Sequence, residues 1–87
     1  MPVIAPQLSP QESATAQQET NQSLRIAATN LTAVRGKTLN AAQSDMVSKI
    51  SSFLKDAHEA AQTSDWSRAR SLAKKAEVLS NELVSSL

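Results

Sequence analysis

The sequence predicts an all-α protein: an antiparallel, up-down-up three-helix bundle that follows a short proline-containing spacer. Alanine, serine, glutamine and leucine dominate the composition, which favours helix over strand. Gly36 is the sole glycine, and Phe53 and Trp66 are the only aromatic residues, whereas sheets need aromatic and β-branched strands with glycine-rich turns. Three stretches carry hydrophobic residues at intervals of three and four, the period of one helix face.

The composition also excludes several kinds of site. The chain has 87 residues, the size of one domain, and it contains no cysteine. Disulfides, thiolate nucleophiles and cysteine-based zinc or iron–sulfur sites are therefore excluded. Nine basic residues balance eight acidic ones, which argues against a strong electrostatic partner such as duplex DNA. We expect no transmembrane segment, because the longest apolar run is too short to span a bilayer.

Residues 1–9 are expected to form a flexible spacer, because Pro2 and Pro6 leave this stretch without a helical period. The helical domain then covers residues 10–87. Short connections make consecutive helices antiparallel neighbours. The helices are predicted over about residues 10–35, 41–62 and 66–86.

The first helix has a clear start. Ser9 can cap it, Pro10 suits its first position, and Glu12 completes a capping box. The polar stretch 13–23 has no apolar face beyond alanine, and we expect it to fray or to project past the bundle. Gly36 is expected to end the helix in a left-handed conformation. The core stripe lies in the second half of the helix and comprises Leu24, Ala27, Leu31 and Val34.

The second helix is the most amphipathic segment of the chain. Asn40 is the expected N-cap, with Gln43 at the third helical position. Its core stripe comprises Val47, Ile50, Leu54, Ala57 and Ala61, widened on one flank by Met46, Phe53 and Ala60.

The third helix follows a short turn, with Asp65 as its expected N-cap. Its stripe comprises Ala69, Leu72, Ala76, Leu79 and Leu83, with Ala73 and Ser80 beside that line. The three stripes can close on one shared core, and we place Leu54 and Leu72 at its centre. The alanines allow the helices to approach closely.

Small residues flank the turn Ser64-Asp65-Trp66 on both sides: Ala57, Ala60 and Ala61 before it, and Ala69, Ala73, Ala76 and Leu79 after it. Over residues 52–83 this pattern resembles the helix–turn–helix of a tetratricopeptide repeat, whose turn often reads Gly-Asp-aromatic. Ser64 replaces that glycine here. One hairpin is present, so the resemblance implies the hairpin but not the superhelical groove, which requires stacked repeats.

A second pattern covers residues 24–87. It comprises Leu31, Arg35-Gly36-Lys37-Thr38-Leu39-Asn40, Ile50-Ser51-Ser52-Phe53-Leu54, Asp65-Trp66-Ser67-Arg68-Ala69, Leu72-Ala73-Lys74-Lys75-Ala76 and Leu79. This pattern is similar to the C-terminal helical part of small, uncharacterised bacterial envelope lipoproteins. In those proteins a signal peptide and a lipidated cysteine precede a proline-rich spacer.

This sequence shows neither the signal peptide nor the cysteine. The resemblance therefore implies a trimmed mature fragment, located in the bacterial envelope; without it the expected location is the cytoplasm. The resemblance implies no activity and no site residues.

We identify no catalytic residue, no metal ligand set and no cofactor site, and we expect that the protein is not an enzyme. His58 is the sole histidine, and a catalytic or metal role requires partners that converge on it. Asp56 and Glu59 point to other sides of the predicted helix. The serines are not set in a nucleophile elbow.

Four hydrophobic residues are candidate contacts for a protein partner: Ile26, Phe53, Trp66 and Val78. Ile26 and Val78 fall off the core stripes of their helices, and together with Phe53 they could mark an interaction patch. Trp66 either covers the end of the hairpin or forms an exposed aromatic anchor. The sequence does not place these residues relative to one another.

Four basic residues cluster on the third helix: Arg68, Arg70, Lys74 and Lys75. Helical spacing places Arg68 and Lys75 on one flank near Glu82. It places the other two on the opposite flank near Glu77. A solvated, charge-balanced face is the main expectation. The alternative is contact with nucleic acid, although aromatic residues for base stacking are absent from this face.

These observations favour a non-catalytic helical module that acts through an unknown protein partner or in assembly. The first alternative is a weak nucleic-acid-associated module that uses the basic residues of the third helix. The second is a self-assembling structural element, in which a helical seam pairs two chains. We expect a monomer or a weak homo-oligomer.

Overall fold

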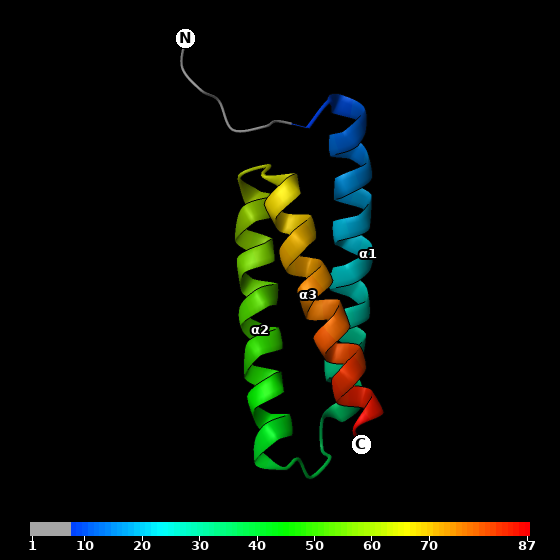
Figure 1. The fold of residues 1–87 in the computed structure, drawn as a ribbon, viewed down its shortest axis with the longest axis vertical. Helices are drawn as coiled ribbons and strands as arrows, with labels where there is room; N and C mark the ends of the chain where they lie inside the picture. Colours follow the sequence, from blue (N-terminus) through cyan, green and yellow to red (C-terminus); the bar gives the residue numbers. More distant parts are fainter. Residues whose placement is uncertain (1–7) are drawn as a thin grey trace.

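The computed structural model describes residues 8–87, and over this range the chain forms three helices joined by two connections. They are α1 (Pro10–Val34), α2 (Ala41–Gln62) and α3 (Trp66–Ser85). Consecutive helices run in opposite directions in an elongated antiparallel bundle (Figure 1). The all-α three-helix fold is confirmed, and the helix bounds agree with the prediction to within one residue. Most of the predicted spacer, residues 1–7, lies outside the described residues.

The helix starts are formed by the capping residues that the sequence predicts. The Ser9 hydroxyl accepts the Glu12 N–H at 3.1 Å, and the Glu12 carboxylate accepts the Ser9 N–H at 3.1 Å. Hydrogen bonds to the side chain and backbone of Ser9 lower the pKa of Glu12 below its ordinary value. Asn40 and Gln43 form the same reciprocal pair at 2.8 and 2.9 Å, and Asp65 caps α3. Each cap satisfies backbone donors that the helix leaves unpaired.

Two left-handed residues terminate α1 and α2. Gly36 has a φ of 79° and follows Arg35 in extended backbone, and Lys37 N–H donates to the Val34 carbonyl at 3.2 Å. This is a type II turn, whose third residue requires positive φ. The predicted left-handed glycine is confirmed, and it lies in this turn, just beyond the C-cap Arg35.

Ser64 takes the corresponding role after α2, with a φ of 59°. Its N–H donates to the Ala61 carbonyl at 3.0 Å, and the Asp65 N–H donates to the Ala60 carbonyl at 2.9 Å. These two bonds define a Schellman motif, which usually has glycine at the left-handed position. Ser64 therefore occupies a left-handed backbone position that glycine would adopt without strain.

Ser64→Gly should stabilise the protein by about 0.5–1 kcal/mol, because glycine removes the left-handed penalty of a residue with a Cβ. Gly36→Ala is the matched opposite change and should destabilise by about 1 kcal/mol. A Cβ at Gly36 would meet no atom within 4 Å, so that loss comes from the backbone alone. Urea denaturation measures both values. A shift of both variants in the same direction would contradict this account of the turns.

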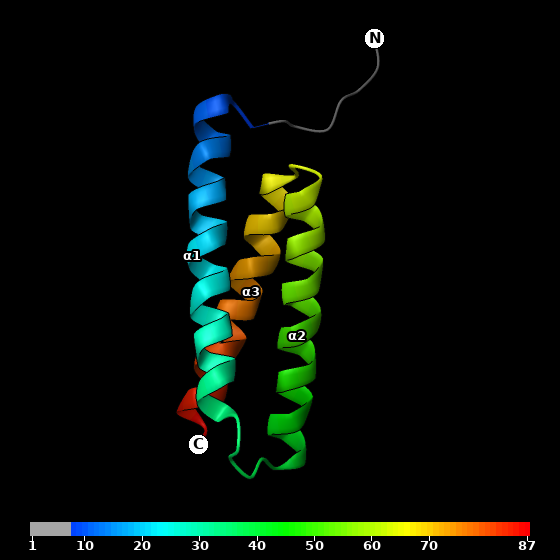
Figure 2. The same cartoon turned by 180° about the vertical axis from the view of Figure 1, so that it is seen from behind.

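Helix α3 is the central element of the bundle. It packs along both α1 and α2, whereas α1 and α2 contact each other only slightly. Figures 1 and 2, seen from opposite sides, both show α3 between the other two helices. The buried line of α3 comprises Ala69, Ala73, Ala76, Ser80 and Leu83.

This buried line corrects the predicted one. Ala73 and Ser80 are fully buried, whereas Leu72 and Leu79 are half-buried. The prediction placed Leu54 and Leu72 at the bundle centre, but both lie on its flanks as half-buried residues. The reason is that α3 meets a helix on two sides, so its most enclosed positions lie between the two contacts; four of the five are small residues, and Leu83 is the large one.

The large hydrophobic residues gather toward the end of the bundle that holds the α1–α2 connection. The buried cluster there comprises Ala27, Val34, Ile50, Ala76 and Leu83. Seven partly buried residues pack against it: Leu31, Leu39, Met46, Val47, Phe53, Leu54 and Leu79. The opposite end is packed with small side chains instead, including buried Ala57, Ala60 and Ala69.

The polar half of α1 is helical, and of the two expected alternatives, fraying or projection past the bundle, only projection is found, in its first turns. Ala16, Thr20 and Ser23 are buried. The Thr20 hydroxyl donates to the Ala16 carbonyl at 2.7 Å, so burial leaves it hydrogen-bonded. The first turns of α1 do extend beyond the α2–α3 turn (Figure 1). Small and polar side chains pack here because they permit a close approach to α3, which a search for large apolar residues does not detect.

Ala73→Leu should destabilise the bundle by about 1–3 kcal/mol, because Ala73 is fully buried and the added carbons overfill a closely packed site. Ala14→Leu is the matched control. It introduces the same side chain at an exposed helical position and should change stability by less than about 0.5 kcal/mol. Chemical denaturation followed by circular dichroism measures both. Equal midpoints would mean that α3 is not closely packed at this position.

Candidate functional site

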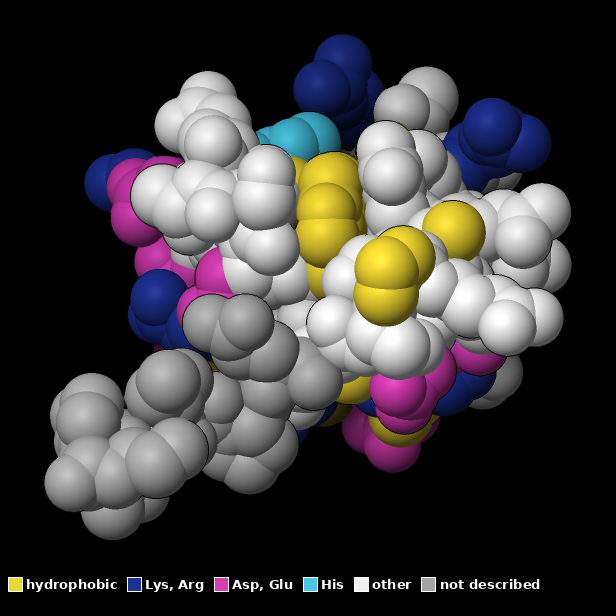
Figure 3. Space-filling model, turned by 90° about the horizontal axis from the view of Figure 1, so that it is seen from above, with side chains coloured by type: hydrophobic (Ala, Val, Ile, Leu, Met, Phe, Trp, Pro, Cys, Tyr) yellow, Lys and Arg dark blue, Asp and Glu magenta, His cyan; other side chains and the backbone are white. Residues whose placement is uncertain are grey.

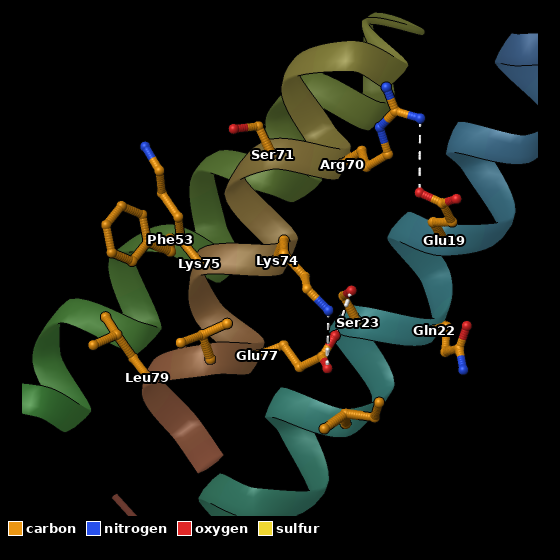
Figure 4. Close-up of a pocket in the computed structure, with 12 residues that line it drawn as sticks. Glu19, Gln22, Ser23, Phe53, Arg70, Ser71, Lys74, Lys75, Glu77 and Leu79 are labelled. Carbon is orange, nitrogen blue, oxygen red and sulfur yellow. Dashed lines mark hydrogen bonds and ion pairs between the residues drawn. The ribbon is translucent and has the colours of Figure 1, made fainter. Parts of the chain in front are cut away.

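A shallow groove of about 950 Å³ runs along the outward side of α3 (Figure 4). Its floor is supplied by seven residues of α3: Arg70, Ser71, Lys74, Lys75, Glu77, Val78 and Leu79. One side is lined by α1 through Glu19, Gln22, Ser23 and Ile26, and α2 contributes Phe53 on the other side. The groove therefore spans all three helices, and its floor is the face of α3 opposite to the buried line.

Three of the four hydrophobic candidates meet in this groove. Ile26 and Phe53 are half-buried, and Val78, which also lines the groove, is 44% exposed. Trp66 does not line it. That residue is the first of α3 and is half-buried beside the α2–α3 turn. The structure thus joins Ile26, Phe53 and Val78, which lie far apart in the sequence, and leaves Trp66 apart from them.

Three of the four basic candidates also line the groove, and Arg68 is exposed outside it. An Arg70 guanidinium nitrogen lies 3.7 Å from the Glu19 carboxylate of α1, a pairing that crosses helices and that the sequence did not indicate. The Lys74 ammonium lies 3.4 Å from Glu77, on the flank where the sequence placed both residues.

Lys75 has a different environment from the other cations. Its ammonium lies 5.9 Å from the centroid of the Phe53 ring, within the range of a cation–π contact. In the described part of the chain no ion pair joins Lys75 or Arg68 to Glu82, although helical spacing puts these residues on one flank. Lys75 therefore presents its charge to solvent at the edge of the groove.

A polar network along the α1 side of the groove joins α1 to α3. The Glu77 carboxylate accepts the Ser23 hydroxyl at 2.7 Å, and the Glu77 side chain is only 15% exposed. One turn further along, the Asn30 amide donates to the Ser80 hydroxyl at 2.9 Å. Ser80 in turn donates to the Glu77 carbonyl at 2.8 Å. Sequence reasoning missed this network, because serine and asparagine on a helix give no signal of their partners.

The effects of substitutions at Ser23 and Glu77 on the free energy of unfolding should be coupled. In a double-mutant cycle with Ser23→Ala and Glu77→Ala we expect a coupling of about 1–2 kcal/mol, since a largely enclosed carboxylate loses a hydrogen bond. The control cycle uses Asp45→Ala and Lys49→Ala, a pair whose side chains are 68% and 63% exposed. Its coupling should not exceed about 0.5 kcal/mol. If the two cycles gave equal couplings in urea denaturation, the network would not hold α1 to α3.

The rest of the described surface offers no comparable site. His58 is exposed, and residues 8–87 contain no group of three or more histidine, cysteine or acidic side chains arranged to hold a metal ion. None of the three helices is both long and apolar enough to cross a membrane. Figure 3 views the end with the α2–α3 turn, where a strip of hydrophobic side chains shows between polar ones and charged side chains lie toward the rim.

Comparison of the chain with protein-family models, with curated proteins and with solved structures finds no match to any of them.

Proposed function

We propose that this protein is a non-catalytic helical module that binds a protein partner through the groove along α3. The observation that carries the proposal is the meeting of Ile26, Phe53 and Val78, from three different helices, on one surface. Hydrophobic residues scattered singly are ordinary, but several gathered in a concave surface with a charged edge are typical of interaction sites. The groove covers less than three turns of α3, which suits a short segment of the partner rather than a standard protein interface.

The charges in the groove favour a protein over a nucleic acid. Two of the three cations already have carboxylate partners, since Arg70 pairs with Glu19 and Lys74 with Glu77. Both carboxylates line the same groove and leave it with a low net positive charge, which suits one or two carboxylates of a protein better than a run of phosphates. Nucleic-acid binding requires several free cations and usually stacking aromatics, and here Lys75 already lies over the aromatic ring of Phe53.

The cellular setting rests on the sequence resemblance alone. If the protein is part of a bacterial envelope lipoprotein, its module would be tethered by the spacer and would meet partners at the membrane surface. Sequencing the reading frame upstream of this segment tests the setting, because a lipid-accepting cysteine must precede the spacer.

Val78→Asp should abolish capture of a specific protein from a bacterial envelope extract, because it replaces an exposed apolar residue of the groove with a charge. Val84→Asp is the matched control: Val84 is also an exposed valine of α3, but it lies outside the groove. The captured protein is then purified and titrated against each variant by calorimetry. We expect Val78→Asp to weaken binding at least tenfold, about 1.4 kcal/mol, with Val84→Asp unchanged.

Circular dichroism should show equal melting for both variants, since each residue is exposed. Capture that is insensitive to Val78→Asp would remove the groove as the binding face. A dimer mass for the parent chain that Val78→Asp converts to a monomer mass would instead support the self-assembly alternative.

A further inference from the structure

We infer that the partner segment is an acidic amphipathic helix of another protein. This inference rests on the proposed function and adds the chemistry of the ligand. It follows from the charge that the groove exposes, from where its apolar residues lie, and from the lack of any backbone to which an extended segment could pair.

The exposed charge of the groove is positive, although its formal charges nearly balance. Arg70 and Glu19 are similarly exposed, at 39% and 52% of their side chains, and cancel each other. In the second pair the cation is the exposed member, since the Lys74 side chain is 63% exposed and that of Glu77 only 15%. Lys75 adds a further exposed ammonium beside the Phe53 ring. Two ammonium groups thus face the solvent side of the groove, and partner carboxylates are their complement.

Most of the apolar residues lie toward one end of the groove, and Phe53, beside Lys75, is the exception. The three cations lie within residues 70–75 of α3, and Val78 and Leu79 follow toward its C-terminus, with Ile26 opposite on α1. Residues 70–79 span about 14 Å at the helical rise, or two to three turns. A partner helix of that length can place apolar side chains at i, i+3 or i+4 and i+7. Its carboxylates would then lie at one end, against the cations.

A helix fits this groove better than an extended strand. Strand addition requires an exposed sheet edge with unpaired backbone groups, and residues 8–87 contain no strand. The groove walls are helices whose backbone bonds are internal, so recognition must come from side chains. An amphipathic helix satisfies its own backbone and presents one apolar face, as the groove requires.

The test uses three labelled synthetic helical peptides of about 14 residues, long enough to cover the groove. The first carries leucines at i, i+3 and i+7 with glutamates at one end. The second replaces the glutamates by lysines, and the third replaces the leucines by serines. Each is titrated into the full chain by fluorescence anisotropy, with amide chemical shifts recorded in parallel. We expect binding of the acidic peptide alone, with the largest shifts at Ile26, Phe53, Lys75 and Val78.

Charge reversal then separates the inference from the proposed function. Lys75→Glu should lower the affinity for the acidic peptide at least tenfold. Lys55→Glu on α2, outside the groove, should change that affinity less than about twofold. Four results would overturn the inference that the partner is an acidic helix. They are equal binding of the lysine peptide, unchanged affinity of Lys75→Glu for the acidic peptide, chemical-shift changes outside the groove, and no binding by any peptide. If Val78→Asp still abolished capture of the purified partner, the proposed function would survive that result.

Discussion

The line of small residues on α3 is the constraint on which the rest of this structure depends. Ala69, Ala73 and Ala76 leave room for both α1 and α2 to pack on the same helix. The two contacts converge on this one line of α3, and α1 and α2 contact each other only slightly. The opposite side of α3 stays open to solvent, and the groove follows from that geometry.

Small side chains bury little apolar area, so the helices need additional links between them. At the end with the α1–α2 connection, large buried residues such as Ile50 and Leu83 link the helices. Polar contacts add further links: Ser23 bonds to Glu77, and at the end with the α1–α2 connection the Gln43 amide donates to the Ser86 carbonyl at 3.0 Å, joining the start of α2 to the end of α3. These bonds contribute modestly, but each also prevents a buried polar group from remaining unsatisfied.

The sequence prediction is accurate for interactions between residues close in the sequence and less accurate for contacts between helices. Caps are local, so Ser9, Asn40 and Asp65 locate the helix starts from a few neighbouring residues. The choice between Leu72 and Ala73 as the enclosed position depends on where two other helices lie, which helical periodicity does not encode. The groove is intermediate: Ile26 and Val78 were identifiable as off-core residues, but their meeting depends on the rotation of α1 against α3.

The two faces of α3 therefore carry separable tasks. Its inner face holds the bundle, and a change there alters stability and, through the positions of α1 and α2, the shape of the groove as well. Its outer face is exposed at Val78, so a change there can alter binding without a cost in folding. Lys74 and Glu77 mark the boundary, because one is exposed in the groove while the other bonds to α1. A partner that draws Lys74 away from Glu77 would leave Ser23 as the remaining side-chain donor to that carboxylate, and binding and helix packing would then be linked at this point.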